Sequence, residues 1–107
     1  SACRHAVVAS KHAAREPDVD YRDAFWTATL GGARALGLGD TLGSFAVGKQ
    51  FDACKIECEA GVYDTFPECI PDGTPRLHID FEQFLNLGDD RNVAAVFVQG
   101  RLVKGAV

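Results

Sequence analysis

The sequence predicts an α/β fold that is incomplete on its own. Two helical patterns occupy the first third of the chain, and β-type runs appear at residues 51–58 and 93–103. These runs provide only about three strands in 107 residues. A lone three-stranded sheet leaves its edges unpaired, so we expect additional protein to cover these elements.

Composition limits the possible functions. A length of 107 residues accommodates one ordinary domain, and no apolar stretch is long enough to span a membrane. The net charge of −4 argues against nucleic acid as a partner, because phosphate binding requires clustered lysine and arginine. The chain has four cysteines without a secretory signal, which favours reduced thiols and a cytoplasmic location. It has no methionine, so we expect it to be a piece of a longer protein.

Each of the first two helices is predicted from its pattern and its ends. The first helix carries a narrow face of small residues and should end near Glu16 and Pro17; the face is formed by Ala2, Ala6, Ala9 and Ala13. The second helix should begin after an Asp20 cap, with Asp23 in its first turn, and close at Gly37. The pair Gly31-Gly32 inside this helix predicts the close approach of another backbone.

The later elements follow from alternation and turn residues. The strand at 51–58 should place Cys54, Ile56 and Cys58 on one packed face. Residues 59–79 form a proline-rich loop, after which a short helix at 80–87 begins at an Asp80 cap. The dipeptide Gln99-Gly100 has the form of a two-residue hairpin turn between the last strands.

Two groups of residues have side chains suited to metal binding or catalysis. The Cys54-x3-Cys58 pair could hold zinc only with Cys69 and His78 as further ligands, so buried thiols are the favoured interpretation. His5 and His12 share one side of a helix without a placed acid or nucleophile, which predicts surface histidines. We therefore expect no catalytic, metal-binding or substrate-binding residue in this chain.

Two polar turns are expected to be structural or to lie at an interface. The denser one is formed by Asp89, Asp90, Arg91 and Asn92, and adjacent carboxylates on a turn point in different directions, which argues against a catalytic pair. The other turn carries Gly48 and Asp52, where the connector enters the first predicted strand.

Two motifs resemble a known family. Residues 28–38 (ATLGGARALGL) and 42–53 (LGSFAVGKQFDA) resemble the closing segment of metal-dependent amidohydrolases. Residues 84–93 (FLNLGDDRNV) and 96–101 (VFVQGR) resemble, more narrowly, the C-terminal quarter of the guanine deaminase family.

The resemblance implies more than the residues alone. Residues 1–38 would be the last helices of a (β/α) barrel, and residues 39–107 part of a flanking β-domain with an inserted loop at 59–79 and a short helix at 80–87. The parent would be a homodimeric zinc enzyme that hydrolyses guanine to xanthine and ammonia, and the partner of this chain would be the rest of that polypeptide. The family's zinc-ligand motifs are absent here, so zinc would belong to the parent. The alternative is a non-catalytic module that binds proteins or associates with itself.

Overall fold

The elements follow the predicted order of helix, helix, strand, helix, strand, strand. The computed structural model describes residues 1–13, 18–58 and 70–106. Its helices and strands are α1 (Ala2–His12), α2 (Tyr21–Trp26), the π-helical turn η1 (Thr27–Gly31), α3 (Gly32–Ala35), β1 (Ala53–Ile56), α4 (Arg76–Leu87), the 3-10 turn η3 (Asp90–Asn92), β2 (Val93–Val98) and β3 (Arg101–Gly105). The described chain is therefore a mixed α/β structure. Its division into parts at residue 38 remains a prediction.

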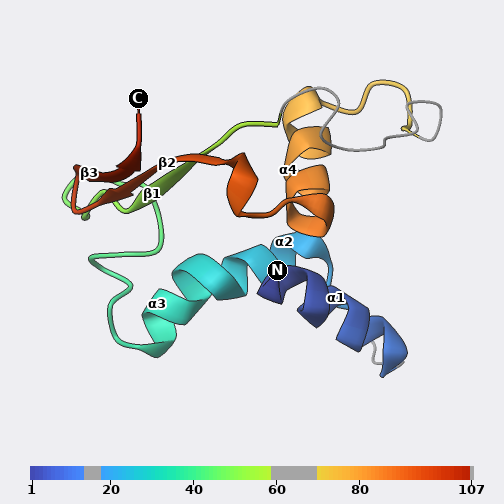
Figure 1. Ribbon diagram of the computed structural model, residues 1–107. Helices are drawn as coiled ribbons and strands as arrows, with labels where there is room; N and C mark the ends of the chain where they lie inside the picture. The colour runs from blue at the N-terminus through green and yellow to red at the C-terminus, as the bar shows by residue number, and fades with distance from the viewer. Residues whose placement is uncertain (14–17, 59–69, 107) are drawn as a thin grey trace.

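The helices and the sheet occupy different ends of the molecule (Figure 1). The helices α1 and α2 lie against each other, and α1 also contacts α4. Helix α4 rises from the α2 region, whereas the small sheet lies away from α4, above α3 in the view of Figure 1. No helix within the described ranges combines the length and apolarity that a membrane crossing requires.

The three strands form one antiparallel sheet in the order β1-β2-β3. The predicted hairpin turn is confirmed, since Gln99 and Gly100 both adopt left-handed φ values of 49° and 76°. The shared packed face predicted for Cys54, Ile56 and Cys58 is wrong. The register shifts between Lys55 and Ile56, which breaks the alternation, and Cys54 is exposed while Ile56 and Cys58 are half-buried.

Helix α1 packs against the described chain through one face and leaves its alanine face uncovered. Cys3, Val7 and Ser10 are half-buried, whereas the alanine face, Ala2, Ala6, Ala9 and Ala13, is exposed. The helix ends at His12, and the predicted end at Glu16 and Pro17 lies outside the described residues.

The second helix begins as predicted. The Asp20 carboxylate accepts the backbone N–H groups of Arg22 and Asp23, and Asp23 completes a capping box. The chain then continues through η1 and α3 to Gly37, whose φ of 73° closes the helix as expected.

Contrary to the prediction, the pair Gly31-Gly32 does not meet the backbone of another segment in the described chain. A Cβ atom on Gly32 would lie 2.9 Å from the Thr27 carbonyl oxygen of its own helix. A Cβ atom on Gly31 would lie 2.6 Å from the indole ring of Trp26, so this glycine makes room for a side chain of the same helix. The close backbone approach occurs instead at Gly43, where an added Cβ would lie 2.8 Å from the Cα atom of Leu30.

Helix α4 begins at Arg76, four residues before the predicted start. Pro75 precedes it with φ −59°, and proline suits a helix start because its missing N–H has no partner there. Asp80 is therefore not a cap; its carboxylate pairs with Arg76 one turn earlier at 2.8 Å. The helix ends at Gly88 as predicted. Most of the predicted loop, residues 59–69, lies outside the described residues.

The described residues bury a small core. Their only buried apolar residues are Ala24, Leu85 and Ala95, while large apolar side chains such as Leu36, Phe45 and Val47 are exposed by 75% or more. The accessible surface is 8043 Å², against about 5,800 Å² for a folded monomer of this mass. The radius of gyration is 15.6 Å, against about 13 Å for a compact domain. The surface in excess of that of a compact monomer is thus similar in size to the area buried at an obligate protein–protein interface.

Candidate functional site

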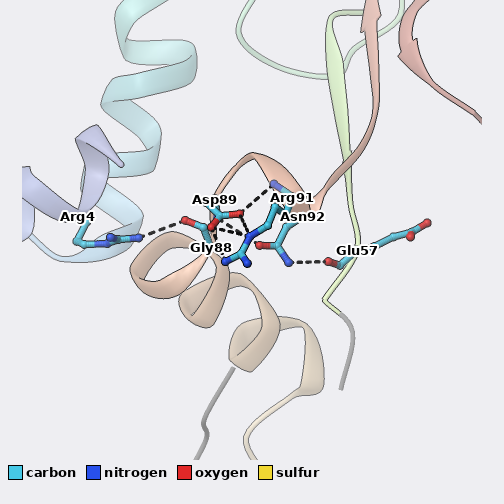
Figure 2. A network of polar contacts seen from close by, with 6 residues as sticks. All are labelled: Arg4, Glu57, Gly88, Asp89, Arg91 and Asn92. Atoms are coloured by element: carbon cyan, nitrogen blue, oxygen red, sulfur yellow. Dashed lines mark hydrogen bonds and ion pairs between the residues drawn. The ribbon is translucent and has the colours of Figure 1, made fainter. Parts of the chain in front are cut away.

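The predicted polar turn is the junction between α4 and β2. The Asp89 side chain caps η3 by accepting the backbone N–H of Arg91 at 2.9 Å, and it also binds the Arg91 guanidinium at 2.8 Å. Arg4 of α1 donates to the carbonyl of Gly88 at 3.3 Å (Figure 2). Asp90 belongs to η3 and is exposed. The junction therefore joins three segments of the chain.

Asn92 is the buried centre of this junction, with 4% of its surface exposed. Its side-chain oxygen accepts the backbone N–H of Asp89, and its amide group donates to the carbonyl of Glu57 at 3.1 Å. The backbone N–H of Glu57 in turn donates to the carbonyl of Asn92 at 2.9 Å. Figure 2 shows these contacts linking the end of α4 to the chain just after β1. Asn92 thus links the end of α4 to the chain that leaves β1.

Hydrogen bonds stabilise the ionised form of two capping carboxylates, Asp89 at this junction and Asp20 at the start of α2. The Arg91 side chain and backbone N–H lower the pKa of the Asp89 carboxyl, and the Asp23 and Arg22 groups lower that of Asp20 in the same way. Both carboxylates are exposed, so the ionised form is favoured by direct contacts rather than by burial of the pair.

We expect a pH titration to show this directly. In an NMR titration Asp89 should have a pKa below its unfolded value of about 3.9. A lowered folded pKa means that Asp89 stabilises the fold above the unfolded value, and that this contribution is lost as the pH falls through the folded value. Arg91→Gln should raise the Asp89 pKa towards its ordinary value. An Asp89 pKa at or above about 3.9 in the unchanged protein would contradict this assignment.

The second predicted turn secures the opposite end of the sheet. Gly48 has a φ of 90° in a turn with open space around it. The Asp52 carboxylate accepts the backbone N–H of Gln99 at 2.7 Å, and the Phe51 carbonyl accepts that of Gly100 at 2.9 Å. Asp52 therefore fastens the β2–β3 hairpin to the entrance of β1. Because Asn92 binds beyond the other end of β1, the structure does not bring the two predicted groups together.

An apolar cavity on the described chain was not predicted. It has a volume of about 630 Å³ and lies between the second helix and the connector that precedes β1. Its walls are mainly apolar and include Phe25, Trp26, Leu30, Leu42 and Phe45. The helical pattern indicated an apolar face at 24–36, but the fold of the glycine-rich connector against that face has no signal in the sequence.

The described residues do not offer a metal centre. They contain no group of three or more His, Cys, Asp or Glu side chains placed to hold an ion, and Cys69 lies outside them. Cys58 donates to the Asp80 carbonyl at 3.8 Å, and burial raises the pKa of its thiol, which disfavours the thiolate that zinc requires. This part of the chain therefore does not fit a catalytic zinc ion, which needs about three fixed ligands.

Comparison with known proteins identifies relatives of the chain. The Amidohydrolase family matches residues 1–103. The chain is 37% identical to guanine deaminase of Mus musculus over 112 aligned residues, which cover 95% of the chain and 23% of that protein. Guanine deaminase of Escherichia coli is 34% identical over 76% of the chain and 18% of its own length.

A solved structure agrees with these sequence matches. The structure of E. coli guanine deaminase superimposes with a TM-score of 0.72 at 30% identity, covering 98% of this chain and 24% of that one. The chain spans less than a quarter of the length of these relatives. It is homologous to guanine deaminases and belongs to the amidohydrolase family.

Proposed function

We propose that this chain forms the closing quarter of a zinc-dependent guanine deaminase and supports that enzyme structurally. In this proposal residues 1–38 are the last helices of the barrel, and residues 39–107 belong to the flanking β-domain. The observation that carries the proposal is the superposition of 98% of the chain on E. coli guanine deaminase. The proposal includes the homodimeric state implied by the resemblance and the cytoplasmic location expected from the cysteines.

The exposed apolar surface supports a structural role. Phe45, Val47 and Leu36 are among the most exposed large side chains, and they lie on the connector and helix that flank the cavity. Burying such side chains gains about 1.5–3 kcal/mol each. The rest of a barrel enzyme would supply the apolar side chains that cover these residues, and this chain would form one side of that interface.

The chemistry would lie outside the described residues. Hydrolysis of guanine replaces its 2-amino group by the oxygen of water and releases ammonia and xanthine. A bound zinc ion supplies an activated water for such a reaction. Because the described residues do not form a zinc site, the ligands and the proton carrier would come from other parts of the enzyme.

An activity assay tests the proposal. The full-length protein, loaded with zinc, should release ammonia from guanine, and adenine serves as a control for selectivity. The 107-residue chain alone should release none. Absence of guanine-dependent ammonia from the zinc-loaded full-length protein would reject the deaminase assignment, and turnover by the isolated chain would reject the purely structural role.

Self-association is the second candidate, and the exposed apolar surface also favours it. A chain separated from its covering partner should form oligomers through the cavity face. Light scattering distinguishes this candidate, since a monodisperse monomer at tens of micromolar would exclude it.

A further inference from the structure

We infer that the connector at residues 39–44 forms a site for a primary ammonium group, and that the side chain of Lys49 occupies it. The Lys49 ammonium donates to the carbonyl oxygens of Gly39 and Leu42 and to the Ser44 hydroxyl, with the last two contacts at 3.4 and 2.9 Å. This inference does not depend on the deaminase assignment.

The chemistry of the site matches an ammonium ion. Lysine has three N–H donors and no acceptor, and the three oxygens come from three different residues of one short segment. All three acceptors are uncharged, and Lys49 forms no ion pair with the carboxylates of the described residues. The arrangement resembles a carbonyl-lined cation site whose cation is covalently attached to the chain. A planar guanidinium, with donors in a fixed fork, does not match it.

The occupied site determines the shape of the connector. Two backbone bonds close the same loop, from Gln50 to the Thr41 carbonyl and from Leu42 to the Leu38 carbonyl, both at 2.9 Å. This loop places the backbone of Gly43 in close contact with Leu30 of the second helix. The same segment provides one wall of the apolar cavity. Lys49 is therefore a positioning residue for the surface that faces the cavity.

The test is hydrogen exchange in the full-length protein carrying Lys49→Ala. Exchange at the Thr41, Leu42 and Gln50 amides should accelerate about tenfold or more, because charge-assisted hydrogen bonds that close the loop are lost. Propylammonium, which restores the missing carbons and the ammonium group, should slow the exchange again. Tetramethylammonium carries the same charge without N–H donors and should not.

Two further variants control the result. Lys55→Ala removes an exposed lysine that pairs with Glu57 at 2.8 Å on β1, and it should leave the three amides unchanged. Ser44→Ala keeps Lys49 but removes one oxygen of the site, so it should accelerate the same amides by a smaller factor even if Lys49→Ala fails to fold. Unchanged exchange in both Lys49→Ala and Ser44→Ala would overturn the inference. Rescue by both ammonium ions alike would overturn the requirement for N–H donors.

Discussion

Gly43→Ala is expected to destabilise the protein by about 2–5 kcal/mol. An added Cβ would lie 2.8 Å from both the Leu30 Cα and the Ala33 Cβ, and 3.0 Å from the Thr29 carbonyl oxygen. Two of these contacts are with backbone atoms, which cannot move without distorting the helix. The φ of 86° adds the cost of a left-handed conformation for a residue with a side chain. Urea unfolding of the full-length protein measures the loss.

Gly48→Ala is the matched control for this change. Gly48 has almost the same φ, 90°, but nothing lies within 4 Å of an added Cβ. Gly48→Ala should therefore lower the free energy of unfolding only by the cost of the left-handed conformation, about 1–2 kcal/mol. Equal losses for the two variants would show that Gly43 is required for its backbone angle and not for the contact between connector and helix.

Asn92→Ala is expected to cost about 2–5 kcal/mol. The substitution removes a side chain that is 4% exposed, and it leaves the part-buried Asp89 N–H and Glu57 carbonyl without their hydrogen-bond partners. Unpaired buried polar groups cost about 1–3 kcal/mol each. Urea unfolding should show the loss, and hydrogen exchange should show faster opening where α4 meets β2.

Asp90→Ala provides the comparison within the same turn. Asp90 is exposed, and its substitution should change the free energy of unfolding by less than about 0.5 kcal/mol. If Asn92→Ala were as mild as Asp90→Ala, the junction would not depend on the buried amide, and α4 would be held by other contacts.

The local signals in the sequence predicted much of the fold. The Asp20 cap, the helix ends at Gly37 and Gly88, and the Gln99-Gly100 hairpin all match the structure. Each of these features is determined by the conformational or hydrogen-bonding preference of one or two residues, so neighbouring sequence is enough to predict it.

The errors occur where distant contacts override local preference. Asp80 looks like a cap, yet the helix begins four residues earlier, at Arg76. Within this helix Phe81 packs edge-on against Phe25 of α2, with the ring centroids 4.8 Å apart. The bulge at Lys55 and Ile56 depends on the pairing partner β2, which alternation along one strand does not reveal.

The predictions for the candidate site were also right where neighbouring residues determine the structure and incomplete where distant residues do. The turn at 89–92 was expected to be structural from its composition, but the choice of Asn92 as its buried centre depends on Glu57, 35 residues earlier. The contacts of Lys49 also depend on how the connector folds back, and a lone lysine in a glycine-rich segment does not predict them.

We propose that these elements complete their hydrophobic packing only against further protein. Calorimetry of the isolated 107-residue chain, held monomeric, tests it most directly. We expect a broad transition with an unfolding enthalpy well below the about 60–80 kcal/mol typical of a 100-residue domain. A single sharp transition with the full enthalpy would contradict the claim, because it would show a self-sufficient core.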